Sequence, residues 1–213
     1  MNMSHLRCTK GQTLLFYGDS ITDAGATNHA PPYGEGYLSM LRDILREDYP
    51  GHDLTFVNAG ISGNTLEGLD LRWERDLLPH RPDWVFIFIG INDAHVTLGM
   101  DRDPEQRLEH FKNLYQDLID RTREAFPAVC MVLVTPYYID RETSPIYQLM
   151  GRYVQCVHDL GQKNGLPVVD TQVVFDRALA EQPPDAWSAD RVHPFPNGHQ
   201  LIADAILAYL ETD

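Results

Sequence analysis

The chain has 213 residues, 43% of them hydrophobic and 23% charged, and a formal net charge of −14 at pH 7. This length suits one domain over residues 1–213, and the acidic balance argues against a protein that binds nucleic acid or an anionic membrane through a broad basic surface. Three cysteines without a C-x-x-C pair argue against a disulfide framework, and with no signal-like or membrane-length apolar run we expect a cytoplasmic protein.

Short β-rich runs alternate with longer helical patterns along the chain. The apolar runs are mostly continuous, which is typical of strands buried on both faces of a parallel sheet; they cover residues 13–17, 54–58, 84–89, 129–135 and 167–170. Apolar residues at helical spacing predict helices over residues 37–47, 104–126, 146–164 and 196–210. Cys130 lies in the fourth apolar run and is expected in the core.

This alternation predicts an α/β protein. Strands that alternate with helices favour a three-layer α/β/α sandwich around a flavodoxin-like parallel sheet of about five strands. In such sheets, ligands bind outside the carboxyl ends of the strands. Glycines and polar residues follow three of the predicted strands, at residues 18–20, 58–64 and 90–93, so we expect these distant segments to converge on one rim.

Ser20, directly after the first predicted strand, is the candidate nucleophile, but a serine hydroxyl is weak unless a base activates it. His193 is the candidate base, because Asp190 precedes it by three residues and Pro194 disfavours helix at this position. A turn there would bring the Asp190 carboxylate to Nδ1 and leave Nε2 facing outward. Taken alone, the pair is more often a simple loop cap. His199 is a competing base that lacks an acid three residues upstream, and it ranks behind.

An acyl-transfer site also needs donors for the oxyanion. Gly63 has no side chain, so its backbone N–H can approach a substrate closely, and Asn92 supplies a neutral side-chain donor. The structural alternatives are a plain turn glycine and a turn-stabilising asparagine, since residues 91–94 are turn-like. Asp19 is expected to bond backbone groups around the serine rather than to act as a catalytic acid.

Taken together, these segments resemble the SGNH, or GDSL-type, hydrolase family, which is named for serine, glycine, asparagine and histidine in four blocks. The matching blocks are the G-D-S at residues 18–20, Gly63, the G-I-N-D at residues 90–93 and the D-R-V-H-P at residues 190–194. They occur in the family's order and span nearly the whole chain. Ile21 stands where the family commonly has leucine.

The resemblance implies a serine esterase that works through an acyl-enzyme with no metal and no organic cofactor. It assigns Ser20 as the nucleophile, His193 as the general base and Asp190 as the residue that orients the base. It also implies an oxyanion hole made of the Ser20 N–H, the Gly63 N–H and the Asn92 side chain.

Further stretches look like the bacterial acetylxylan-esterase branch of this family: residues 60–65, 72–76, 82–84, 89–93 and 135–139. Members of that branch remove acetyl groups from xylose units, often on short oligosaccharides inside the cell, and they assemble as oligomers. The resemblance therefore implies an acetylated sugar as substrate and a homo-oligomer. Tyr33, Trp187 and Phe195 could stack on a sugar ring and His95 could contact the substrate, although packing or a surface position explains each equally well.

Two alternatives stay open. Within the same fold, the chain could be a lysophospholipase, a thioesterase or an arylesterase, although no extended apolar lid favours long acyl chains. From another class, it could be a non-catalytic binding module, against which the complete set of Ser20, Asp190 and His193 argues.

Overall fold

A five-stranded parallel sheet forms the centre of the computed structural model, which describes residues 5–99, 103–140 and 144–212. Its strands lie in the order β3-β2-β4-β5-β6, which is the flavodoxin-like order when they are numbered among themselves. All five predicted strands are confirmed, with bounds that shift by one or two residues: β2 (Thr13–Gly18), β3 (Thr55–Gly60), β4 (Trp84–Phe88), β5 (Cys130–Val134) and β6 (Val168–Val169).

The central strands owe their place to uninterrupted apolar sequence. Leu14, Leu15 and Phe16 of β2 are fully buried, as an apolar strand covered on both faces requires. Phe16 lies opposite Phe86 of β4 in the parallel register, and their rings stack with centroids 4.7 Å apart. Such contacts fix the register of the two strands that carry the site.

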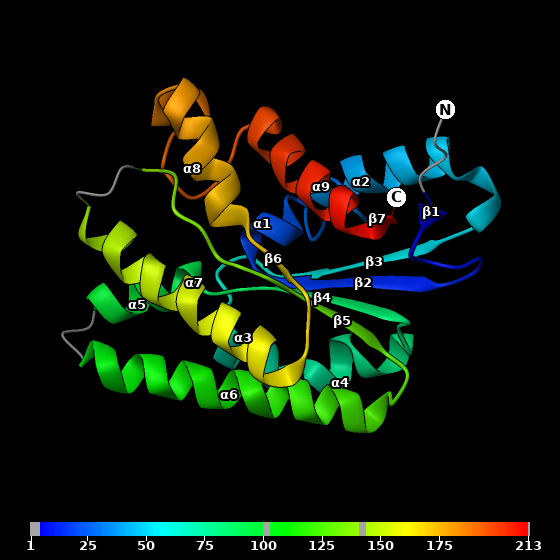
Figure 1. Cartoon of the computed structure of the whole chain (residues 1–213), viewed down its shortest axis with the longest axis horizontal. Helices are drawn as coiled ribbons and strands as arrows, with labels where there is room; N and C mark the ends of the chain where they lie inside the picture. The colour runs from blue at the N-terminus through cyan, green and yellow to red at the C-terminus, as the bar shows by residue number, and fades with distance from the viewer. Residues whose placement is uncertain (1–4, 100–102, 141–143, 213) are drawn as a thin grey trace.

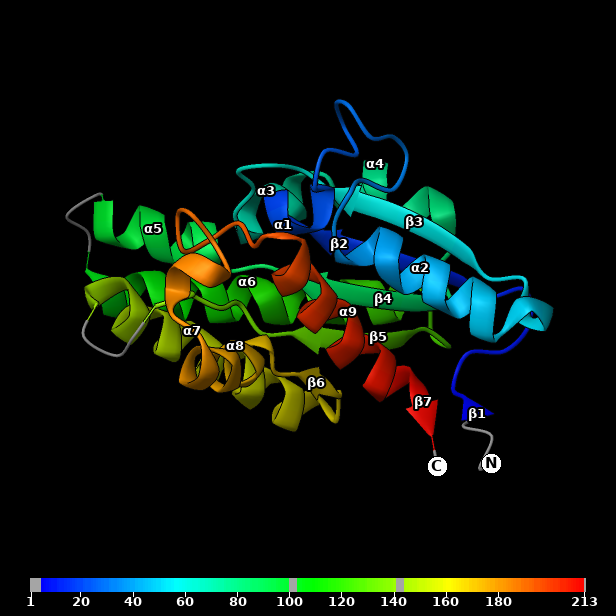
Figure 2. The same cartoon turned by 90° about the horizontal axis from the view of Figure 1, so that it is seen from above.

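Helices cover both faces of the sheet, which confirms the three-layer α/β/α sandwich (Figure 1). One face carries α2 (Tyr37–Asp48), α8 (Thr171–Glu181) and α9 (Pro196–Leu210). The other carries α3 (Leu66–Leu71), α4 (Trp73–Asp76), α5 (Ile91–Gly99), α6 (Pro104–Ala125) and α7 (Pro145–Asn164). Figure 2 shows α2 and α9 side by side over the sheet, where they pack against each other. The four predicted helices are α2, α6, α7 and α9.

The sequence patterns did not predict α3, α4, α5, α8 or the one-turn helix α1 (Ser20–Asp23). Residues 91–94 were expected to form a turn but instead begin α5, so Asn92 projects from a helix. Near the two ends of the chain, β1 (His5–Leu6) pairs antiparallel with β7 (Glu211–Thr212). Within the ranges given above, no helix is long and apolar enough to cross a membrane.

Cys130 is exposed, so the expected core position is wrong. It is the first residue of β5, and the four residues after it are buried. A strand begins at the rim of the sheet, so an apolar run can start one residue before the core does.

The strand order reverses next to β2, and this places the site. The chain passes from β2 to the edge strand β3 and then returns to β4 on the other side of β2. In open α/β sheets such a reversal leaves a crevice at the carboxyl ends of the central strands. Ser20 follows β2 and Asn92 follows β4, so both lie at this crevice, with the segment after β3 beside them.

Candidate active site

The turn that carries Ser20 is built on a close approach of β2 and β4. A Cβ at Gly18 would lie 2.3 Å from Thr22 Oγ1 and 2.6 Å from the carbonyl oxygen of Phe88. Only glycine fits this position, because real Cβ atoms do not come so near to other heavy atoms. The chain then enters α1, which puts the Ser20 N–H in a first helical turn, where backbone N–H groups have no intrahelical acceptor.

Asp19 caps α1, as the expectation of a structural role requires. Its side chain is buried, and Oδ1 accepts the Ile21 N–H at 3.0 Å. Burial raises the pKa of Asp19 to about 7, against the lowering effect of the Ile21 N–H and of His193. The carboxyl group therefore titrates near neutral pH while it is bonded to the backbone of the serine turn.

Ser20, His193 and Asp190 form a continuous hydrogen-bonded chain. Ser20 Oγ lies 2.8 Å from His193 Nε2, and His193 Nδ1 lies 2.6 Å from Asp190 Oδ2. Because an ionised carboxylate only accepts hydrogen bonds, the Asp190 contact places the imidazole proton on Nδ1. Nε2 is then free to accept the serine proton, which is the arrangement that a nucleophile and its general base need.

Asp190 is ionised because its other oxygen is saturated with donors. Oδ1 accepts the N–H groups of Val192 at 3.0 Å and His193 at 2.8 Å, and the Ser188 hydroxyl lies 3.0 Å away. Burial raises the pKa of Asp190, but the hydrogen bonds from the His193 side chain and these donors outweigh it and hold the pKa well below its usual range. The carboxylate thus keeps its charge for the imidazole.

The segment around the pair, residues 187–195, is hereafter the base loop. The segment after β5 anchors it: the Tyr137 hydroxyl donates to the Val192 carbonyl at 3.0 Å, and the Ile139 N–H donates to the Arg191 carbonyl at 2.9 Å. These bonds connect the loop to the sheet, although half of each side chain of Asp190 and His193 stays exposed.

His199, the competing base, has a different partner. Its Nδ1 accepts the backbone N–H of Tyr37 at 3.2 Å and so supplies an acceptor to the first turn of α2. Burial lowers the pKa of His199 to about 4, and His193 contributes in the same direction. The ring is therefore neutral and its acceptor nitrogen is in use, which leaves His193 as the histidine that meets the serine.

Gly63 and Asn92 are connected through Asn64, the residue that follows Gly63. Gly63 lies in the segment of residues 61–65, hereafter the 61–65 loop, with φ +79°, a backbone conformation that glycine adopts readily. The Asn92 side-chain Nδ2 donates to the carbonyl of Asn64 at 2.9 Å. One of the two amide N–H groups of Asn92 thus fixes the residue next to Gly63.

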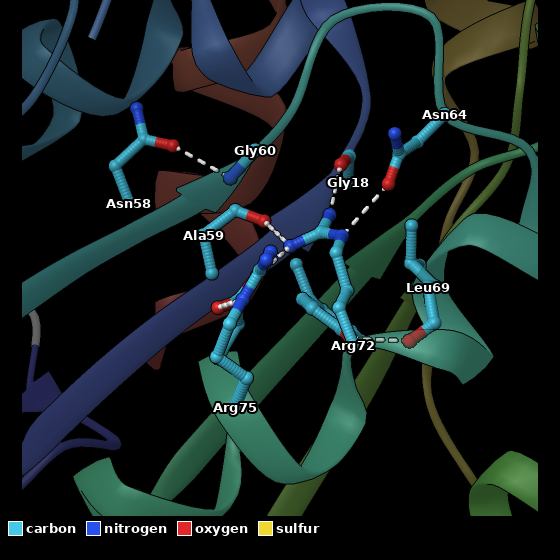
Figure 3. Close-up of polar contacts among 10 residues, drawn as sticks. Gly18, Asn58, Ala59, Gly60, Asn64, Leu69, Arg72 and Arg75 are labelled. Carbon is cyan, nitrogen blue, oxygen red and sulfur yellow. Dashed lines mark hydrogen bonds and ion pairs between the residues drawn. The ribbon is translucent and has the colours of Figure 1, made fainter. Parts of the chain in front are cut away.

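Buried carboxylates hold both ends of the 61–65 loop. Asp23 of α1 accepts the Ser62 hydroxyl at 2.7 Å, and Asp93 of α5 accepts the Leu66 N–H at 3.2 Å. Burial raises the pKa of Asp93 to about 7, partly offset by the Leu66 N–H. In addition, Arg72 Nε donates to Asn64 Oδ1 at 2.7 Å (Figure 3). The loop is thereby tied to the serine turn, to α5 and to the end of α3.

Sequence reasoning did not assign three of these supporting residues: Arg72, Asp93 and Ser188. Asp93 is the last residue of the G-I-N-D block but was given no role there, and Arg72 stands in a stretch quoted only for its resemblance to a family branch. Ser188 lies two residues before Asp190, where a serine ordinarily indicates no more than a turn.

The four residues predicted to contact the substrate differ from one another in exposure and in their neighbours. The Tyr33 ring lies under the Arg42 guanidinium, whose carbon is 4.5 Å from the ring centroid. The side chain of His95 is exposed, and its Nδ1 lies 3.0 Å from the Ile91 carbonyl. Phe195 is 40% exposed. Trp187 is only 8% exposed and its ring packs into the core, so of the two alternatives left open for it, packing is the one the structure shows.

Within residues 5–99, 103–140 and 144–212, the structure contains no group of three or more histidine, cysteine, aspartate or glutamate residues that could hold a metal ion.

Known proteins resemble this chain over nearly its whole length. Residues 16–201 match the GDSL-like lipase/acylhydrolase family. An acetylxylan esterase of Geobacillus stearothermophilus is 35% identical over 95% of each chain. The crystal structure of that organism's acetylxylan esterase Axe2 matches with a TM-score of 0.88 and 34% identity over 98% of each chain.

Further solved structures are similar to this chain over most of their length. They include catalytic mutants of Axe2 in which a serine, an aspartate or a histidine is replaced by alanine. LAE5, an alpha/beta hydrolase enzyme from the metagenome of Lake Arreo, matches with a TM-score of 0.86 and 34% identity over 96% of this chain and 97% of its own. The chain therefore belongs to the GDSL-like lipase/acylhydrolase family, has the SGNH hydrolase fold and is a carboxylic ester hydrolase.

Proposed function

We propose that this protein is a serine esterase that removes O-acetyl groups from carbohydrate, with acetylated xylo-oligosaccharides as the favoured substrates. The observation that carries the proposal is the hydrogen-bonded chain from Ser20 through His193 to Asp190 at the carboxyl ends of the central strands. In the proposed site, Ser20 is the nucleophile, His193 the general base and Asp190 the residue that orients and stabilises the imidazole.

In the first half of the reaction, Ser20 Oγ attacks the acetyl carbonyl carbon and its proton passes to His193 Nε2. The imidazolium is stabilised by the ionised Asp190. The carbonyl oxygen becomes an oxyanion, which accepts hydrogen bonds from the N–H groups of Ser20 and Gly63 and from the Asn92 side chain. The C–O bond to the sugar then breaks, and the leaving sugar oxygen takes the proton from His193.

In the second half, water replaces the sugar. His193 Nε2 takes a proton from the water as the water oxygen attacks the acetyl-serine carbonyl. The same donors stabilise the second oxyanion, and its collapse releases acetic acid, which then ionises to acetate, while Ser20 Oγ recovers the proton from His193. Each half moves one proton through Nε2, so the cycle returns the enzyme unchanged and needs no redox partner.

Two observations support the acetylated sugar. The acetylxylan esterase relative covers nearly the whole chain at 35% identity, and solved mutants of Axe2 are described as an acetyl-xylooligosaccharide esterase. In addition, the side chains of Asp190 and His193 are each 54% exposed, so the histidine side of the site is open to a bulky alcohol. An acetyl group is the small part of such an ester and the sugar is the large part.

The proposal includes a cytoplasmic homo-oligomer, as the resemblance to the acetylxylan-esterase branch implies. Light scattering of the purified chain would report a mass that is a multiple of 24.3 kDa. A monomer mass at micromolar concentration would contradict this part and leave the chemistry untouched.

The test compares acyl chain lengths on wild type, Ser20→Ala and a matched serine control, Ser39→Ala. Ser39 lies in α2, where its hydroxyl donates to the Gly36 carbonyl. We expect acetyl esters and acetylated xylo-oligosaccharides to be hydrolysed fastest, Ser20→Ala to lose about 10⁴-fold or more in kcat, and Ser39→Ala to stay active. A serine-directed phosphonate should label Ser20.

Two outcomes would overturn the proposal. An optimum at eight carbons or more would favour a lysophospholipase or thioesterase. Failure of the phosphonate to label the folded protein at Ser20, together with no loss in Ser20→Ala, would remove Ser20 as nucleophile.

A further inference from the structure

Arg72 is a buried arginine whose guanidinium joins the ends of two strands to the 61–65 loop. It lies between α3 and α4, and its side chain is 6% exposed (Figure 3). A charged side chain is rarely buried this deeply unless it is paired and hydrogen-bonded. Its partners therefore indicate what it does.

The guanidinium donates in three directions. Nη2 donates to the Gly18 carbonyl at 2.8 Å, Nη1 to the Ala59 carbonyl at 2.8 Å, and Nε to Asn64 Oδ1 at 2.7 Å. Gly18 is the last residue of β2, two residues before Ser20, and Ala59 lies at the end of β3. One rigid planar group thus sets the separation between the serine turn and the 61–65 loop.

The charge of Arg72 is compensated by a carboxylate and an aromatic ring. Asp76 Oδ2 accepts from Nη1 at 2.9 Å, and the Tyr17 ring lies 4.5 Å from the guanidinium carbon. A lysine could supply the charge but not the fork, because its ammonium is a single point with no fixed plane. The site therefore uses the geometry of arginine rather than its charge alone.

Asn64 carries this geometry to the proposed oxyanion donors. Its side-chain oxygen accepts from Arg72, while its backbone carbonyl accepts from Asn92 Nδ2 at 2.9 Å. Gly63 immediately precedes it. The Gly63 N–H and the Asn92 side chain therefore both depend on the position of Asn64. Displacements of about 0.5 Å already weaken a preorganised hole.

We propose that Arg72 is a positioning residue for the oxyanion hole and acts through Asn64. The inference rests on the roles proposed above for Gly63 and Asn92. Arg72 touches neither the substrate nor the reacting atoms. It holds the Gly63 N–H and the Asn92 amide at the place where negative charge develops, so its contribution belongs to the transition state.

The kinetic signature follows from that assignment. A residue that only positions transition-state donors lowers kcat and kcat/KM together and leaves KM nearly unchanged. Loss of one oxyanion donor costs about 10²–10³ in kcat, and a displaced donor is only weakened. We therefore expect Arg72→Lys and Asn64→Ala each to lose about 10- to 100-fold in kcat on an acetyl ester.

The double variant tests whether the two residues act along one path. If Arg72 works through Asn64, the loss in Arg72→Lys/Asn64→Ala stays close to the larger single loss instead of reaching the product of both. Affinity for a trifluoromethyl ketone, which forms a tetrahedral adduct with a serine, should fall in parallel with kcat/KM across the series. Affinity for acetate should not change.

Arg121→Met is the matched control. Arg121 also has a carboxylate and an aromatic partner, since Nη2 donates to Asp70 at 2.6 Å and the guanidinium carbon lies 4.6 Å from the Trp73 ring centroid. Its substitution removes the same kind of interactions, but these are made with α3 and α4 rather than with the 61–65 loop. We expect it to lower the free energy of unfolding while kcat stays within about twofold of wild type.

Each outcome decides the question. If Arg72→Lys does not fold, Asn64→Ala alone carries the test, because it leaves the other partners of Arg72 in place. Wild-type kcat in folded Asn64→Ala, multiplicative losses in the double variant, or a loss confined to KM would overturn the positioning role. An inactive wild type, or a wild type that does not need Ser20, would overturn the proposed function and this inference with it.

Discussion

Ser20 and His193 lie side by side in the site, but different kinds of contacts hold them in place. The serine region comprises residues 18–23 and the 61–65 loop. Its side chains Ile21, Thr22 and Asp23 are almost fully buried, and its hydrogen bonds reach across the sequence, as from Arg72 to Gly18. In the base loop, Asp190 and His193 are 54% exposed, and each donor to Asp190 lies within three residues of it.

This difference separates two tasks. The serine region depends on several strands and helices at once, so its donors are preset by folding of the whole domain. The base loop depends mainly on its own turn and can stay open to substrate. Substitutions of the half-exposed Asp190 and His193 should therefore change proton transfer with little loss of stability, whereas substitutions in the serine region should change both.

The largest effect should come from Asp190→Asn. An amide keeps an oxygen for the backbone N–H groups of Val192 and His193, but its nitrogen cannot accept the Nδ1 proton of His193. The imidazole then loses its preferred tautomer, and we expect kcat to fall about 10⁴-fold with almost no change in the free energy of unfolding.

Asp185→Asn provides the control, since Asp185 pairs with Arg191 in the same segment and is 81% exposed. It should keep wild-type kcat. A loss below about tenfold in Asp190→Asn would remove the orienting role of Asp190.

Asn92→Ala should have the next largest effect and should lower both kcat and the free energy of unfolding, as expected for the serine region. Loss of one oxyanion donor lowers kcat by about 10²–10³, and the Asn64 carbonyl loses the donor that it has in the folded protein. We therefore expect a smaller free energy of unfolding as well, measured by urea denaturation. Asn113→Ala, an exposed asparagine on α6 that bonds Glu109, should change neither. Unchanged turnover in Asn92→Ala would exclude Asn92 from the hole.

Ser188→Ala should act more weakly and on the base loop alone. The hydroxyl is fully buried, 3.0 Å from Asp190 Oδ1 and 2.8 Å from the His193 carbonyl. Removal of a hydrogen bond to a carboxylate costs about 1.5–3 kcal/mol when the partner stays buried. Because Asp190 is half exposed and keeps the N–H groups of Val192 and His193, we expect a loss of only about tenfold in kcat with KM unchanged. A changed KM at constant kcat would indicate a role in substrate binding instead.

The same contrast explains how far the sequence could predict the site. The base loop is a local motif, so Asp190 and His193 could be paired from their spacing before any contact was visible. The strands could be predicted because apolar runs such as that of β2 are buried on both faces. Short helices such as α1 and α3 have too few residues to show a period.

Residues that support the site through partners far away in the sequence form no local sequence pattern. Arg72 finds its partners 54 residues before it at Gly18 and 13 residues before it at Ala59, so no spacing rule points to them. Trp187 shows the same limit, because the sequence left open whether this loop aromatic stacks on a sugar or packs, and in the structure it is buried in the core. Burial in a loop depends on the elements that close over it, which a single sequence does not contain as a pattern.

The smallest effect on turnover belongs to the buried acid of the serine turn, whose titration changes stability instead. Burial raises the pKa of Asp19 to about 7 in the folded protein, compared with about 3.9 in an unfolded chain. Between these values the folded state holds a proton that the unfolded state has lost. The contribution of Asp19 to stability is therefore complete below about pH 4 and is lost as pH rises to 7, with a slope of at most about 1.4 kcal/mol per pH unit.

Asp19→Asn keeps an oxygen for the Ile21 N–H and removes the titration. The free energy of unfolding of wild type minus that of Asp19→Asn, measured by urea denaturation from pH 4 to 8, should decrease with pH up to about 7 and then level off. A difference that does not change with pH would mean that Asp19 is ionised throughout in the folded state. The serine turn would then carry a buried negative charge beside the proposed nucleophile, and the serine region would have to compensate it by donors other than the Ile21 N–H.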